Sequence, residues 1–252
     1  MPELLRNMST GLMDWLCPGR CAACDEPLGP GQALFCEVCA SSLVLLEGPR
    51  CPRCGARLAR GGCVECRRAS SLFEMARSLY SYGGALAQVI QRYKYGSRLD
   101  LARPLGVLLA KALGEPHSVF SSGALVVPVP SSQMALGRRG FDPVMEILRT
   151  IDGLRWAPLL VRVDRREAQA ALEGRERRSL GPEAFRPRGK GPVGEPPLVL
   201  VDDVLTTGAT VRAAARALMA LGARAIGVVT LARAEELPPG PSGVEVVLAS
   251  SP

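Results

Sequence analysis

Apolar and polar positions alternate along the chain in a way that predicts strands and helices in turn. Short apolar runs bounded by Gly, Pro or charged residues predict buried strands within 72–82, 123–130, 156–163, 198–201, 223–234 and 244–250. Apolar positions at helical spacing predict two helices within 85–114, broken near Gly96, and further helices at 143–154 and after residue 208. We expect loops at 133–142 and a basic excursion at 162–190. This order predicts an α/β fold with an open, mostly parallel sheet and helices on both faces.

The first sixteen residues carry apolar side chains at helical spacing. We expect a short amphipathic helix that packs on the protein, rather than on a membrane surface, because the segment has almost no basic residues. Its apolar run is too short and broken for a secretory signal, and no run approaches the roughly 18 residues of a membrane span. The sequence therefore predicts a cytoplasmic protein with no membrane span.

All nine cysteines lie in the first 66 residues, and eight of them form four C-x-x-C pairs. Each pair places two thiolates on a tight turn, which fills half of a tetrahedral zinc site. Pairing in sequence order gives C-x2-C-x11-C-x2-C followed by C-x2-C-x8-C-x2-C. A disulfide framework is the alternative, but a cytoplasmic setting disfavours it. We predict two structural Zn²⁺ ions in a double zinc ribbon, with the ligands Cys21, Cys24, Cys36, Cys39, Cys51, Cys54, Cys63 and Cys66.

The formal net charge of +7 is compatible with an anionic partner. The second ribbon concentrates basic residues, of which Arg50, Arg53 and Arg57 are candidates for nucleic-acid contacts. Five of the eleven aromatic residues lie in 73–95 among basic residues, and Lys94 and Tyr95 there are further candidates, because interleaved rings and cations bind single strands. The alternatives are a solvated arginine surface and rings that pack into the core.

The stretch 198–210, with the sequence LVLVDDVLTTGAT, combines a buried strand with a polar turn. Two adjacent carboxylates, Asp202 and Asp203, can accept hydrogen bonds from ribose hydroxyls or hold hydrated Mg²⁺. The following residues provide hydroxyl groups, close backbone approach and free N–H groups at a helix start, which suits a phosphate; they are Thr206, Thr207, Gly208, Ala209 and Thr210. Capping and turn chemistry is the alternative, but it does not explain the whole run. The pattern predicts a ribose 5-phosphate site.

This stretch resembles the motif by which type I phosphoribosyltransferases bind 5-phosphoribosyl 1-diphosphate (PRPP). Together with the cysteine pairs and the segments RYKYG (92–96), VVPVPSS (126–132) and RRGFDP (138–143), the chain is similar to the ComF family of competence-related proteins. The resemblance implies a PRPP site in which 202–203 contact ribose and Mg²⁺ and 206–210 hold the 5-phosphate. It also implies that Arg138 or Arg139 faces the pyrophosphate, with Lys94 as a further cation.

The helical spacing at the start of the chain, the cysteine pairs and the resemblance together predict three parts: an N-terminal helix at 1–16, a double zinc ribbon at 17–68 and a phosphoribosyltransferase-like domain at 69–252. The function we expect is PRPP binding combined with handling of single-stranded DNA during uptake, with competence-machinery proteins as further partners. The alternative is an Mg²⁺-dependent phosphoribosyltransferase that acts on an unidentified nucleobase.

Overall fold

The computed structural model describes residues 19–29, 32, 34–59, 62–68, 72–114, 123–163, 184–189 and 196–235. The predicted N-terminal helix, the strand at 244–250 and most of the basic excursion lie outside these residues. The strands are β1 (Met75–Ser81), β2 (Leu125–Pro128), β3 (Leu160–Arg162), β4 (Phe185–Pro187), β5 (Leu198–Leu205) and β6 (Ile226–Arg233). The helices are α2 (Glu37–Ser41), α3 (Val64–Arg68), α4 (Gly84–Tyr95), η1 (Leu99–Leu101), α5 (Ala102–Leu113), α6 (Gln133–Arg139), α7 (Pro143–Arg149) and α9 (Ala209–Ala220).

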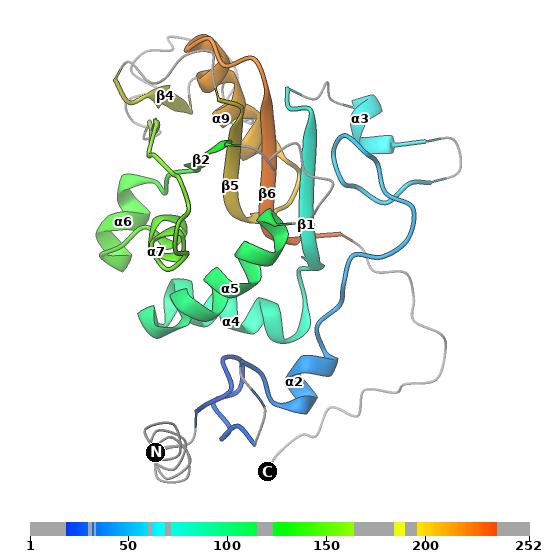
Figure 1. Cartoon of the computed structure of the whole chain (residues 1–252), viewed down its shortest axis with the longest axis vertical. Coiled ribbons are helices and arrows are strands. Elements are labelled where there is room, and N and C mark those ends of the chain that lie inside the picture. Colours follow the sequence, from blue (N-terminus) through cyan, green and yellow to red (C-terminus); the bar gives the residue numbers. More distant parts are fainter. Residues whose placement is uncertain are drawn as a thin grey trace, which may run out of the picture.

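Four parallel strands form the central sheet in the order β1-β6-β5-β2 (Figure 1). A separate antiparallel pair, β3 and β4, lies beside α9. The predicted α/β fold with a mostly parallel sheet is confirmed. β5 is longer than its apolar run suggests, because it continues through both carboxylates to Leu205, still paired with β6.

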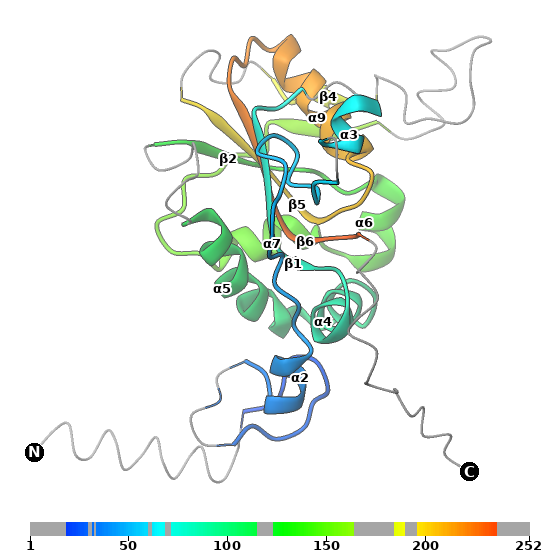
Figure 2. The same cartoon turned by 90° about the vertical axis from the view of Figure 1, so that its right-hand side faces the viewer.

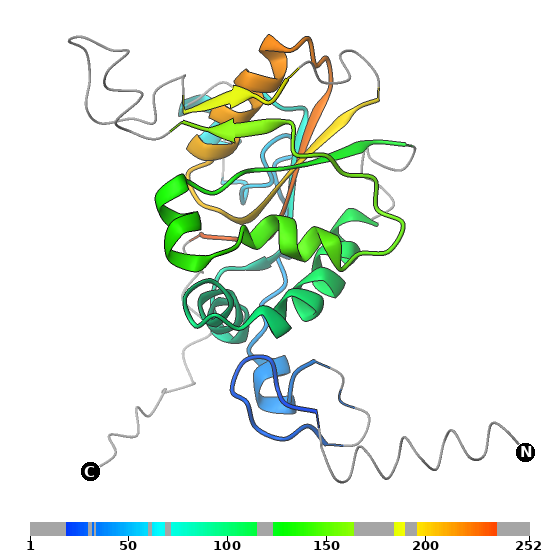
Figure 3. The ribbon, with the colours of Figure 1, turned by 90° about the vertical axis from the view of Figure 1, so that its left-hand side faces the viewer.

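Alternate residues of the central strands face two different helix layers. Val199 and Val201 of β5 belong to the core under α4, α5 and α7, whereas Leu198 and Leu200 belong to the core under α9. Figures 2 and 3 show these helices on the two sides of the sheet. The continuous apolar run of β5 thus follows from burial on both faces, as is typical of parallel strands.

The predicted loop at 133–142 is wrong, because residues 133–139 form helix α6. The Ser132 side chain accepts a hydrogen bond from the Ala135 N–H at its start, and Gly140 ends it in the left-handed conformation with φ of 78°. None of its residues is buried, so the helix leaves no apolar periodicity in the sequence. Capping at both ends therefore defines this helix, which lies near the carboxyl end of β2.

The chain that joins the two ribbons covers the free edge of β1. The Leu46 N–H donates to the Leu79 carbonyl, and the Ser81 N–H donates to the Val44 carbonyl. Further along, the Ala76 N–H donates to the Arg53 carbonyl of the second ribbon. These bonds satisfy backbone groups that an edge strand would otherwise expose. No helix among the described residues is long and apolar enough to cross a membrane.

Candidate metal centres and sugar-phosphate site

The eight paired cysteines gather into two clusters of four, in the order that the spacing predicts. One cluster contains Cys21, Cys24, Cys36 and Cys39, and the other contains Cys51, Cys54, Cys63 and Cys66. In each cluster all four Sγ atoms lie within 4.8 Å of one another. Cys17 lies outside the described residues.

The geometry of both clusters fits a tetrahedral zinc ion. Sγ–Sγ distances are 3.7 Å for Cys24–Cys36, 3.8 Å for Cys51–Cys66 and 3.4 Å for Cys54–Cys63. Tetrahedral ligands with Zn–S bonds of about 2.3 Å lie roughly 3.8 Å apart. Four thiolates leave zinc no open position, so these two ions are structural and hold the ribbons in shape.

The first ribbon is fastened to α4 by ion pairs. Asp25 receives hydrogen bonds from Arg98 and Arg92, and these hold the pKa of its carboxyl below the usual range. Arg92 also donates to the Ala23 carbonyl at 2.6 Å. Because Arg92 lies on α4, its bonds to Ala23 and Asp25 join the first ribbon directly to this helix.

The second ribbon is fastened to the carboxyl end of β6 by Arg233, whose side chain is only 2% exposed. Its Nη1 donates to the Cys54 carbonyl at 3.0 Å, and its Nη2 pairs with Glu65. Glu235 lies 3.5 Å from Arg233 Nε and accepts a hydrogen bond of 2.7 Å from Arg50. Two guanidinium groups and two carboxylates thus neutralise one another where the ribbon meets the sheet.

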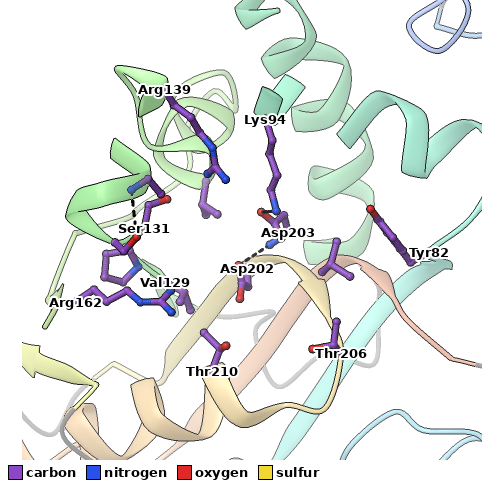
Figure 4. Close-up of a pocket in the computed structure, with 15 residues that line it drawn as sticks. Tyr82, Lys94, Val129, Ser131, Arg139, Arg162, Asp202, Asp203, Thr206 and Thr210 are labelled. Carbon is purple, nitrogen blue, oxygen red and sulfur yellow. Dashed lines mark hydrogen bonds and ion pairs between the residues drawn. The ribbon is translucent and has the colours of Figure 1, made fainter. Parts of the chain in front are cut away.

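A pocket of about 390 Å³ lies at the carboxyl ends of the parallel strands (Figure 4). Its walls come from Tyr82 after β1, the 129–132 segment after β2, the end of β5, the start of α9, and side chains of α4, α6 and β3. Asp142 fixes the 129–132 segment, since its carboxylate accepts from the Ser131 N–H at 2.8 Å while it caps α7. Ligand sites of open α/β sheets occupy this position.

Asp202 and Asp203 project into this pocket from β5. Burial and the neighbouring Asp203 carboxylate raise the pKa of Asp202 to about 8. Asp203 forms an ion pair with Lys94 of α4, drawn in Figure 4. Both acids are partly buried, and they lie side by side on the pocket wall. Their oxygen donors are those that Mg²⁺ prefers, so the residues present fit that ion.

The turn after β5 and the start of α9 bring two threonines to the pocket. Gly208 takes a left-handed φ of 74°, which allows the chain to reverse directly into α9. Thr206 and Thr210 line the pocket, whereas the predicted site residues between them, Thr207, Gly208 and Ala209, are not among its lining residues. The Thr207 hydroxyl accepts a hydrogen bond from the Ala209 N–H at 3.4 Å, which stabilises the turn. The arrangement can bind a phosphate.

Two arginines complete the cationic side of the pocket. Arg139 reaches in from α6 and Arg162 from β3, as Figure 4 shows. Of the two arginines expected to face a pyrophosphate, Arg139 lines the pocket and Arg138 does not. Arg162 and Tyr82 also line the pocket, although the sequence did not predict them as site residues. For Arg162 the excess of basic residues at 162–190 was the only sequence signal of a role in binding anions.

Comparisons with known proteins agree with this architecture. Residues 12–70 match the model of the double zinc ribbon domain, and residues 160–248 match that of the phosphoribosyl transferase domain. The DNA utilization protein YhgH of Escherichia coli K12 is 30% identical over 228 residues, which cover 86% of this chain and 97% of YhgH. The chain belongs to the ComF/YhgH family.

Other relatives of this ComF/YhgH chain carry competence names. Competence protein ComFC of Bacillus subtilis is 27% identical over 84% of this chain and 94% of its own length. Competence protein F of Haemophilus influenzae is 27% identical over 85% of this chain and 97% of its own length. The comparisons thus support a phosphoribosyltransferase-type fold joined to a double zinc ribbon, as the sequence predicts.

The nucleic-acid candidates occupy different environments in this ComF/YhgH protein. Arg50 is half-buried and engaged with Glu235, whereas Arg53 and Arg57 are exposed on the second ribbon. Lys94 points into the pocket toward Asp203, and Tyr95 is exposed. The other rings of 73–95 are buried or half-buried, so packing into the core explains most of that aromatic cluster.

Proposed function

We propose that this protein binds PRPP with Mg²⁺ in the β5 pocket and handles single-stranded DNA in the cytoplasm during DNA uptake. The observation that carries the first part is the meeting of two carboxylates, two threonines of the 206–210 segment and three cationic side chains in one pocket. The names of the relatives, DNA utilization protein and competence protein, support the second. The clustered cysteines are free thiols placed as zinc ligands and not disulfides, and this is compatible with the reducing environment of the cytoplasm.

In this proposal each wall of the pocket binds one part of PRPP. The turn at 206–210 donates hydrogen bonds to the 5-phosphate, and Asp202 and Asp203 accept hydrogen bonds from the ribose hydroxyls. Arg139, with Ser131 and Ser132, faces the pyrophosphate. Asp202 and Asp203 would hold Mg²⁺, which would offset the negative charge of the pyrophosphate. The ion pair between Lys94 and Asp203 neutralises one of the two carboxylates, which reduces their repulsion of an anionic ligand.

The deciding experiment is a calorimetric titration of the zinc-loaded protein with PRPP and Mg²⁺. We compare the wild type with Asp202→Asn/Asp203→Asn and with Asp152→Asn, which removes an exposed carboxylate. Saturable binding by the wild type and by Asp152→Asn, lost in the double variant, would support the proposal. Absence of binding by a folded, zinc-loaded wild type would reject the sugar-phosphate site.

The DNA part is tested separately by the salt dependence of binding to a single-stranded oligonucleotide. Neutralising Arg53 and Arg57 should weaken binding and reduce the slope of log Kd against log salt by about 0.7 for each lost phosphate contact. Arg103→Gln, which removes an exposed arginine of α5, is the control. An unchanged slope would show that the second ribbon does not contact the phosphates.

A further inference from the structure

Tyr95 is the most exposed tyrosine among the described residues. Its side chain is 75% exposed at the end of α4, whereas Tyr80 and Tyr93 are 8% and 1% exposed. The ring lies beside the pocket, because the preceding residue, Lys94, lines the pocket and so does its other neighbour, Arg139. Such an exposed ring contributes little to the core of the protein.

The ring is held in a cation–π contact. The Arg139 guanidinium carbon lies 5.1 Å from the Tyr95 ring centroid. A cation over one face holds an aromatic ring in place and leaves the other face available for a flat partner. Nucleobases are such partners, and unpaired bases stack on tyrosine regardless of sequence.

We propose that Tyr95 and Arg139 form a base-stacking site for single-stranded DNA, and that PRPP in the pocket weakens binding there. The proposal rests on the proposed function above and adds a second DNA contact to the one tested at Arg53 and Arg57. Arg139 belongs to both sites, since it covers the Tyr95 ring and lines the pocket. When the guanidinium turns toward a bound pyrophosphate, the ring loses this contact. By linkage, DNA must weaken PRPP binding by the same factor.

Fluorescence anisotropy with two labelled 20-nucleotide probes of equal charge tests the stacking. One probe is oligo(dT) and the other has an abasic backbone. The wild type should prefer oligo(dT), and Tyr95→Ala should weaken oligo(dT) binding about 5- to 100-fold, the range of one base stack. Tyr95→Ala should leave abasic binding unchanged, and Tyr95→Phe should retain the preference. Met219→Ala, an exposed side chain at the far end of α9, is the control.

The second arm repeats the oligo(dT) titration at saturating PRPP and Mg²⁺. We expect wild-type binding to weaken about 2- to 5-fold, the range of an exposed cation–π contact, and Tyr95→Ala binding to stay unchanged. Equal oligo(dT) affinities of Tyr95→Ala and wild type would overturn the stacking site while DNA handling stands. A wild type that binds neither probe would overturn both. PRPP that binds by calorimetry without changing DNA affinity would overturn the competition, and PRPP that fails to bind would reject the sugar-phosphate function itself.

Discussion

Replacing Arg233 with methionine tests how the second zinc ribbon is held to the sheet. Methionine keeps an unbranched apolar stem but removes the donors to the Cys54 carbonyl and to Glu65. The buried Cys54 carbonyl would lose its charged donor, at a cost of about 1–3 kcal/mol. Glu65 is 48% exposed and returns to water, so its ion pair adds at most about 1 kcal/mol. Glu235 keeps its ion pair with Arg50, so its loss of Arg233 adds little to the destabilisation.

Removing a buried charge also relieves a desolvation cost, and the Arg233 Nε has no hydrogen-bond partner in the structure. This relief offsets part of the loss, so we expect the free energy of unfolding to fall by about 1–3 kcal/mol. For a chain of this length the melting temperature should fall by about 2–6 °C.

Thermal denaturation of the zinc-saturated protein measures this change, and a chromogenic chelator measures release of each zinc ion. Arg233→Met should release the second ion faster and leave the first unaffected, whereas Glu65→Gln should change both little. If Arg233→Met were as stable as the wild type and released zinc at the same rate, the guanidinium would be no better than an apolar side chain at this contact.

Three further outcomes follow from single positions. Asp202→Asn should raise the melting temperature of the ligand-free protein at pH 8. The pKa of Asp202 is raised to about 8, so the folded state holds this proton more firmly than the unfolded state, and wild-type stability falls as pH rises from about 4 to 8. The variant has no such proton and should not lose this stability. Equal pH slopes in thermal melts would contradict this. Gly55→Ala should destabilise the folded protein by about 1–3 kcal/mol more than Gly123→Ala. Both glycines have positive φ, but only a Cβ at Gly55 would lie 2.7 Å from the Ala76 carbonyl oxygen. Equal denaturant midpoints of the two variants would refute the clash. Cys24→Ser should reduce bound zinc, measured by elemental analysis, from two ions to about one, and loss of both would show that the clusters are interdependent.

The sequence predicted those parts of the fold that rest on local pattern. The run from Leu198 to Thr210 combined burial, carboxylates and turn chemistry within thirteen residues, and its strand, turn and helix are confirmed. The cysteine spacing likewise determined which pairs meet. Helix α6 was missed because it buries no side chain, although Ser132 and Gly140 at its two ends were available as capping signals.

Contacts between distant segments could not be predicted in the same way. Arg162 enters the pocket from β3, outside any recognised motif, so nothing nearby in sequence assigns it there. Arg233 and Glu65 meet across 168 positions, and only the fold brings them together. Arg50 is another example, because the sequence gives it the same appearance as the other arginines of the ribbon. Only its ion pair with Glu235 in the fold distinguishes it from its exposed neighbours.

The covered edge of β1 means that the two sequence families in this chain do not correspond to two independent folding units. Residues 44–46 and Arg53 supply the outermost backbone pairing of the sheet. A chain that began after the ribbons would present β1 as a bare template for intermolecular pairing, which favours self-association. The segment between the two zinc clusters therefore shields the edge of the sheet, so we expect zinc removal to increase self-association of the protein.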